Sequence, residues 1–124
     1  NLRNFEPIIS LAVMRELMAV SNLEWRRQLI DFAQKLKTIE INQEVVSLAE
    51  KYVSAGIVPQ NYSADAVHLA VASIHKIDYL LTWNIQHLAH PIKRKAFRDY
   101  NMGHNFFVVE IVTPKELNYQ INQN

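Results

Sequence analysis

The sequence predicts an α/β domain, a three-layer sandwich in which a mainly parallel sheet lies between layers of helices. Short apolar runs typical of buried strands alternate along the chain with longer stretches of helical periodicity, and capping residues stand at their junctions. Strands that are separated by helices pair in parallel, because each helix returns the chain to the same end of the sheet. The length of 124 residues, with 49% apolar and 20% charged residues, suits one domain over residues 1–124.

The first elements are a strand and two helices. An apolar run at residues 7–10 predicts a buried strand, and it leads into a helix at residues 11–20 that is capped by the serine ending the strand. Ser21 and Glu24 have the spacing of a capping box and predict a second helix through about residue 37.

A short strand and a helix are predicted next. Residues 39–41 alternate between apolar and polar, as in a strand, and Asn42 then caps a helix that Gly56 ends. The apolar positions of this helix have helical spacing and are expected to face the core: Val45, Leu48, Ala49 and Tyr52.

The second half continues the alternation of helices and strands. Ser63 is expected to cap a helix, and residues 79–83 are the best strand in the sequence, short and nearly all apolar. A helical stretch broken by Pro91 follows, and residues 107–112 form a last apolar strand. Thr113 then caps a C-terminal helix with a proline at its first position.

Three oxygen-bearing side chains fall beyond the carboxyl ends of strands, where parallel sheets bind ligands. Glu16 follows the first strand, Asp65 lies in the first turn of a helix, and Asn84 ends the strand at residues 79–83. Such oxygens, converging from different elements, suit Mg²⁺ or Mn²⁺. Each also has a simpler explanation: Glu16 as a solvated helix residue, Asp65 as an acid favoured by the helix dipole, and Asn84 as an N-cap.

Two motifs in the second half carry a family resemblance. Residues 64–72 contain D-A-x-H-x-A-x-A, and residues 78–89 contain L-L-T-W-N-x-x-H-L. Together they resemble the second half of the PIN-domain ribonucleases, the fold of many bacterial toxin–antitoxin nucleases. Residues 113–117 are similar to the closing segment of that family, and residues 15–17 to the helix that carries its conserved glutamate. The resemblance covers nearly the whole chain.

The resemblance implies roles for three residues. Glu16 and Asp65 match the acidic metal-site positions and would hold Mg²⁺ or Mn²⁺, whereas Asn84 matches a third catalytic position that is often aspartate. The family's first strand, with its first catalytic acid, should precede residue 1 and does not appear, so the PIN-like fold is expected to be N-terminally incomplete. Without that acid the site has less charge to hold a metal, which leaves open whether the chain is an enzyme as it stands.

Two histidines are candidates for supporting roles in this site. His68 is three residues after Asp65 and therefore shares its helix face, although a packing histidine is the simpler explanation. His87 lies close to Asn84 in sequence. Its spacing of three from His90 suggests zinc, but the chain has no cysteine and no third ligand at a convincing spacing.

The densest basic cluster is a candidate RNA-binding surface, although a solvated helix face explains the same pattern. Thirteen basic and twelve acidic residues give a net charge of +1, so only a local patch could hold phosphates. The cluster comprises Lys93, Arg94, Lys95 and Arg98.

These patterns together favour a metal-dependent endoribonuclease of the PIN type. The resemblance implies three partners: RNA, a small antitoxin protein and a second copy of the chain. The absence of cysteine favours the cytoplasm, and no apolar run approaches the roughly 20 residues that span a bilayer. The alternative is an inactive or truncated PIN domain that binds RNA or protein. A third hypothesis is a small-molecule enzyme that uses His68 or His87 in a deep pocket.

Overall fold

The computed structural model describes residues 8–10, 21–35, 37–82, 88–113 and 115–116. It is a mixed α/β structure in which both pairs of described strands are parallel. The chain divides into two compact units, residues 1–42 and residues 43–124. The α/β class expected from the sequence is therefore confirmed, together with parallel pairing.

The first unit contains a strand pair and a helix. Strand β1 (Ile8–Ser10) pairs in parallel with β2 (Lys37–Ile39), with Ile8 opposite Lys37 and Ser10 opposite Ile39. The second strand thus begins two residues before the alternating stretch that predicted it, because pairing with β1 rather than side-chain alternation sets its bounds. Helix α2 (Leu23–Ala33) lies between them in sequence. The helix predicted at residues 11–20 lies outside the described residues.

Helix α2 begins one residue later than its sequence predicted. The side-chain Oδ1 of Asn22 accepts a hydrogen bond from the backbone N–H of Trp25 at 2.9 Å, which is the geometry of an N-cap. The capping box predicted from Ser21 and Glu24 is therefore wrong, because Asn22 takes the capping position. Trp25, in the first turn of α2, is 58% exposed.

The second unit is built on two helices that pack against each other, α3 (Gln43–Ser54) and α4 (Ser63–Ile74). A single 3₁₀ turn, η1 (Gln60–Tyr62), precedes α4. Ser63 is the first residue of α4 rather than its cap. The prediction for α3 is confirmed, since its four expected core positions are buried: Val45, Leu48, Ala49 and Tyr52.

Helix α3 ends where the sequence predicted. Gly56 has φ +77°, a left-handed conformation that costs glycine little because it has no Cβ. The chain then turns back, and the N–H of Ile57 donates to the carbonyl of Tyr52 at 2.9 Å. Val58, which follows, is buried and extends the core beyond the helix.

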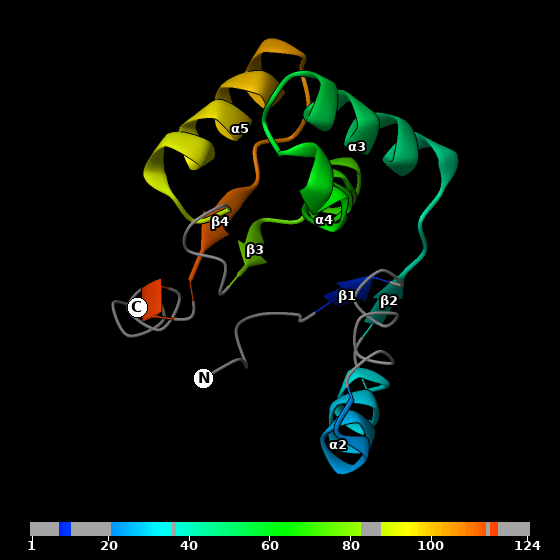
Figure 1. Ribbon diagram of the computed structural model, residues 1–124. Coiled ribbons are helices and arrows are strands. Elements are labelled where there is room, and N and C mark those ends of the chain that lie inside the picture. Colours follow the sequence, from blue (N-terminus) through cyan, green and yellow to red (C-terminus); the bar gives the residue numbers. More distant parts are fainter. Residues whose placement is uncertain (1–7, 11–20, 36, 83–87, 114, 117–124) are drawn as a thin grey trace. The chain divides into compact units, whose positions relative to one another are not determined.

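Figure 1 shows the remaining elements of this unit, α5 (Pro91–Gly103), β3 (Tyr79–Leu81) and β4 (Glu110–Val112). β3 and β4 are parallel, with Tyr79 opposite Glu110 and Leu81 opposite Val112. The predicted strand at residues 107–112 is shorter than expected, and only its last three residues pair. β3 extends through one more bond, from the N–H of Thr82 to the carbonyl of Val112 at 2.9 Å.

Pro91 begins α5 instead of breaking a helix, so this prediction is corrected. Proline suits the first helical position because the N–H that it lacks has no partner there. His90 is the N-cap, and its Nδ1 accepts a hydrogen bond from the N–H of Ile92 at 3.2 Å.

A buried polar cluster joins α3, α4 and α5 of the second unit. Tyr52 of α3, Ser73 of α4 and Asn101 of α5 are each at most 2% exposed. The Tyr52 hydroxyl donates to Oδ1 of Asn101 at 2.7 Å and lies 2.9 Å from Oγ of Ser73. Nδ2 of Asn101 donates to Ser73 Oγ at 2.9 Å and to the carbonyl of Phe107 at 3.0 Å, while Ser73 donates to the carbonyl of Leu69 at 2.8 Å. Every side chain of this cluster is therefore satisfied.

Tyr52 combines these hydrogen bonds with ring contacts in the core. Its ring makes edge-to-face contacts with Phe97 and Tyr100, at centroid distances of 5.5 and 5.4 Å. Burial raises the pKa of Tyr52 to about 12, although its hydrogen bonds to Ser73 and Asn101 act in the opposite direction. The hydroxyl is thus a permanent donor at neutral pH.

Candidate functional site

Asp65 lies where its motif predicts, in the first turn of α4. The half-buried position of its side chain contrasts with the complete burial of Ala66, which faces the core. His68 follows one turn later and is also half-buried, so the two side chains share one face of α4. Helix α4 contacts β3, which belongs to the second motif.

The other expected members of the metal site lie outside the described residues, namely Glu16, Asn84 and His87. The structure follows the second motif as far as Thr82, which is buried and bonded to β4. Asn84 is two residues further along the chain. Thr82 and Thr113 both follow the carboxyl ends of β3 and β4, where a parallel sheet binds its ligands.

The described residues hold no group of three or more His, Cys, Asp or Glu side chains that could bind a metal ion. Asp65 is the one residue of the expected metal pair that the structure describes. A partly buried carboxylate is a suitable ligand for Mg²⁺ or Mn²⁺, which prefer charged oxygen ligands. Of the two histidines whose spacing resembles a zinc motif, His90 uses its Nδ1 as the cap of α5.

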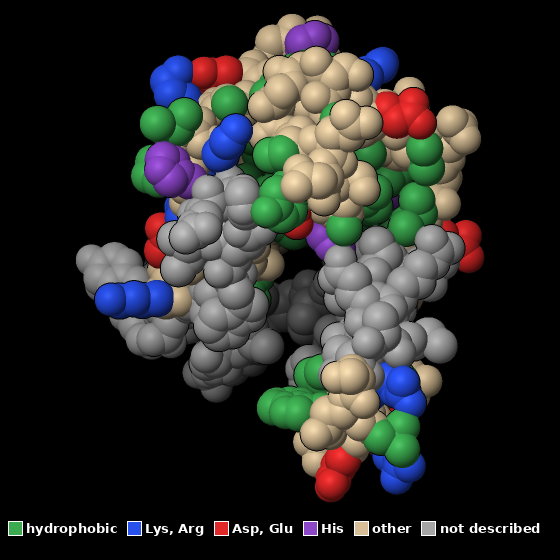
Figure 2. Space-filling model, viewed as in Figure 1, with side chains coloured by type: hydrophobic (Ala, Val, Ile, Leu, Met, Phe, Trp, Pro, Cys, Tyr) green, Lys and Arg blue, Asp and Glu red, His purple; other side chains and the backbone are tan. Residues whose placement is uncertain are grey.

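The residues of the basic cluster differ in their contacts with acidic side chains. Lys95 forms an exposed ion pair with Asp99, one helical turn away, with Nζ 2.7 Å from Oδ2. Arg98 is exposed next to Asp99, and its charge, after the hydrogen bond from Lys95, helps to lower the pKa of Asp99; Lys93 is half-buried. On the face shown in Figure 2, the blue side chains form separate groups rather than one continuous basic patch. The density of positive charge in the sequence therefore overstates the charge that this helix presents.

Arg94 has the most extensive contacts of the four. Its Nη1 and Nη2 donate to the two carboxylate oxygens of Glu116, at 3.0 and 2.9 Å, which is the bidentate geometry that arginine forms with carboxylates. Its Nε donates to the carbonyl of Ala89 at 2.6 Å. Glu116 itself completes a capping box with Thr113, accepting from its N–H at 2.8 Å and donating its own N–H to Oγ1 at 3.2 Å. The N-cap expected at Thr113 is confirmed.

The ion pair has a clear electrostatic consequence. The hydrogen bonds from Arg94, followed by that from the Thr113 N–H, lower the pKa of Glu116 from 4.5 to about 2. Glu116 is therefore a carboxylate at all physiological pH values.

This shift predicts a window of acid sensitivity. Because the pKa of Glu116 is lower in the folded chain, its contribution to stability is complete above pH 4.5 and is lost as the pH falls toward 2. We expect the melting temperature of the native chain to exceed that of Glu116→Gln above about pH 5, with the difference closing toward pH 2. Circular dichroism melts across this range test it; a difference that stays constant down to pH 2 would contradict it.

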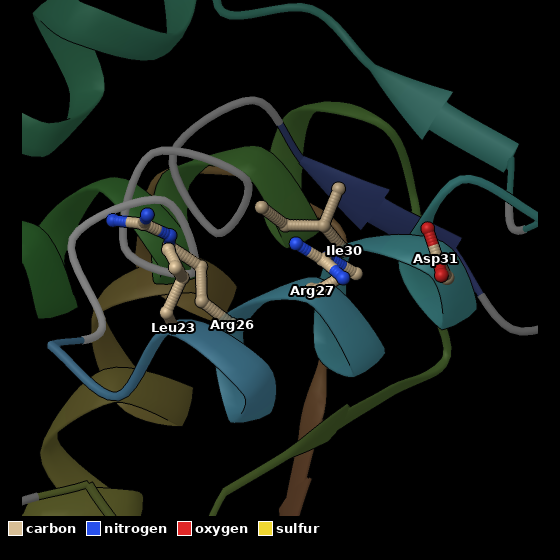
Figure 3. Close-up of a pocket in the computed structure, with 5 residues that line it drawn as sticks. All are labelled: Leu23, Arg26, Arg27, Ile30 and Asp31. Atoms are coloured by element: carbon tan, nitrogen blue, oxygen red, sulfur yellow. The ribbon is translucent and has the colours of Figure 1, made fainter.

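Two open depressions lie along α2 and its cap. The larger, of about 280 Å³, is open to solvent, and Figure 3 shows the side chains along it: Leu23, Arg26, Arg27, Ile30 and Asp31. All of these come from successive turns of one helix. The depression therefore differs from the deep pocket, enclosed by several elements, that a small-molecule enzyme would use.

Comparison with known proteins adds no assignment. No family model matches the chain, and no curated protein or solved structure matches it either. No helix among the described residues is long and apolar enough to cross a membrane.

Sequence reasoning missed two features, the ion pair of Arg94 with Glu116 and the polar cluster around Tyr52. The partner of Arg94 lies 22 residues away, and the only local signal was the T-x-x-E spacing of residues 113–116. The polar cluster around Tyr52 leaves no local signal, because its members stand 21 and 28 residues apart.

Proposed function

We propose that this chain is a metal-dependent endoribonuclease of the PIN type, with a PIN-like three-layer sandwich as its complete fold. The position of Asp65 carries the proposal. Its motif requires an acid in the first turn of a helix that leads into a parallel strand, and α4 and β3 provide this context. A motif found in its expected structural context is stronger support than the motif alone.

The proposal assigns a role to each site residue. Glu16 and Asp65 hold Mg²⁺ or Mn²⁺, and Asn84 completes or orients the site. A bound ion of this kind lowers the pKa of water and offsets the charge of a phosphodiester. Of the supporting residues, His68 would orient the Asp65 carboxylate, with which it shares a face of α4, and His87 follows Asn84 in the second motif.

The basic cluster contributes unequally to RNA binding in this proposal. Arg98 and Lys93 are the first contacts for phosphates, since Lys95 and Arg94 have carboxylate partners within the chain. Phosphate contacts of this kind position an RNA strand without reading its sequence. A small antitoxin and a second copy of the chain are the protein partners that the family resemblance implies.

The decisive test is metal dependence of RNA cleavage. We expect the purified chain to cut a labelled structured RNA with Mg²⁺ or Mn²⁺, to stop when the metal is chelated, and to resume when metal is restored in excess. Circular dichroism under the same conditions shows whether the chain stays folded when the metal is removed. Absence of cleavage by a folded chain, or cleavage that continues in chelator, would overturn the proposal.

A further inference from the structure

Arg94 makes more hydrogen bonds than the other cations of the basic cluster, and Glu116 is its ion-pair partner. The Nε of Arg94 donates to the carbonyl of Ala89, and this bond fixes the direction in which Nη1 and Nη2 point. Glu116 fills that place with both carboxylate oxygens, at 2.9 and 3.0 Å. A phosphodiester offers two oxygens in the same planar arrangement and binds arginine with the same bidentate geometry.

The pair lies where an incoming anion can reach it. The side chain of Arg94 is 29% exposed and that of Glu116 is 44% exposed. Arg98 stands four residues after Arg94 and therefore shares its face of α5, so a second cation lies beside the pair. Solvent and salt screen an ion pair at this degree of exposure, and a polyanion that gains several contacts can replace one such pair.

Glu116 has a second set of contacts that does not depend on Arg94. Its Oε1 accepts from the N–H of Thr113 as well as from Nη2 of Arg94, at 2.8 and 2.9 Å. If Arg94 turned to another anion, the capping box with Thr113 would still hold the glutamate. The segment can thus remain folded with or without the ion pair.

We propose that Glu116 is an internal competitor for the phosphate site at Arg94, an autoinhibitory contact that an RNA backbone must displace. The proposal takes its ligand class from the proposed ribonuclease function. It assigns the site to Arg94 and Arg98 on α5, and it makes Glu116 the residue that limits RNA affinity. The pair of Lys95 and Asp99 is not such a contact, since it is a single-point pair between side chains that are both more than half exposed.

The test measures RNA affinity in chelator, so that cleavage does not interfere. We expect Glu116→Gln to bind a fluorescein-labelled single-stranded RNA roughly 3- to 10-fold more tightly than the native chain, with a salt dependence steeper by about one phosphate contact. Glutamine keeps an oxygen for the Thr113 N–H, so the capping box survives the substitution. The gain is expected to vanish when Arg94→Gln is added.

Two further variants separate competition from simpler effects. Asp99→Asn makes the same change in net charge but breaks the ion pair of Lys95 instead, and it is expected to change affinity less than twofold. Thr113→Ala weakens the cap but keeps the Glu116 carboxylate, and it is expected to leave affinity unchanged. An equal gain in either variant, or no gain in folded Glu116→Gln, would overturn the proposal. These outcomes are independent of metal-dependent cleavage, so the two proposals can fail separately.

Discussion

Replacing Asn101 with leucine is expected to lower the free energy of unfolding by about 3 kcal/mol. Asn101 is fully buried and makes three hydrogen bonds, to Tyr52, Ser73 and the carbonyl of Phe107. Leucine has a similar volume, so the substitution removes these bonds without opening a large cavity. Each buried polar group that is left without a partner costs about 1–3 kcal/mol.

The partners differ in how well they can compensate. The Tyr52 hydroxyl can still donate to Ser73, which lies 2.9 Å away, whereas the carbonyl of Phe107 loses the Asn101 bond with no other described side chain bonded to it. Tyr52→Phe keeps the ring contacts with Phe97 and Tyr100, and it is expected to cost about 1–2 kcal/mol.

Chemical denaturation measures the free energy of unfolding of Asn101→Leu, of Tyr52→Phe and of the variant that combines them. The double variant is expected to lose less stability than the sum of the two single variants, because each removes part of the same network. Met102→Ala is the matched control on α5, since Met102 is 60% exposed and its loss should cost little. A loss below about 1 kcal/mol for Asn101→Leu would show that the cluster contributes less than its burial implies.

The parts of the fold that the sequence predicted are those determined by local chemistry. Apolar spacing placed Val45, Leu48, Ala49 and Tyr52 in the core, and Gly56 marked the end of α3, because both signals act within a few residues. Helix starts were less certain where several capping residues are adjacent. Asn22 was preferred over Ser21 because its side chain reaches the Trp25 N–H, a choice that depends on backbone geometry.

The features that the sequence did not predict depend on contacts between distant segments. Asn101 is a polar residue in a mostly polar helix, and nothing near it in sequence indicates complete burial. Arg94 stands between two lysines and was grouped with them as a phosphate ligand, although its guanidinium binds Glu116. Charge density along a sequence records how many cations are present, but not which of them have an acidic partner after folding.

Asp65→Asn is expected to reduce metal-dependent RNA cleavage roughly 100-fold or more, since even residues that only support metal ligands contribute 10- to 100-fold. The substitution keeps the shape of the side chain and one oxygen, but removes the negative charge that attracts Mg²⁺ or Mn²⁺. Asp65 lies in the first turn of α4, where the helix dipole also favours a negative charge. Some loss of stability is therefore expected alongside the loss of activity.

Glu44→Gln separates these two effects, because Glu44 is the acid in the first turn of α3 and is exposed. It removes the same charge from a comparable helix position, so it should reproduce the dipole contribution of about 0.3–1 kcal/mol while leaving cleavage unchanged. Excess Mn²⁺ should partly restore Asp65→Asn if the defect is weakened metal binding, since mass action compensates for a lost ligand. Undiminished cleavage by Asp65→Asn, or equal losses in both variants, would remove Asp65 from the metal site and with it the observation that carries the proposed function.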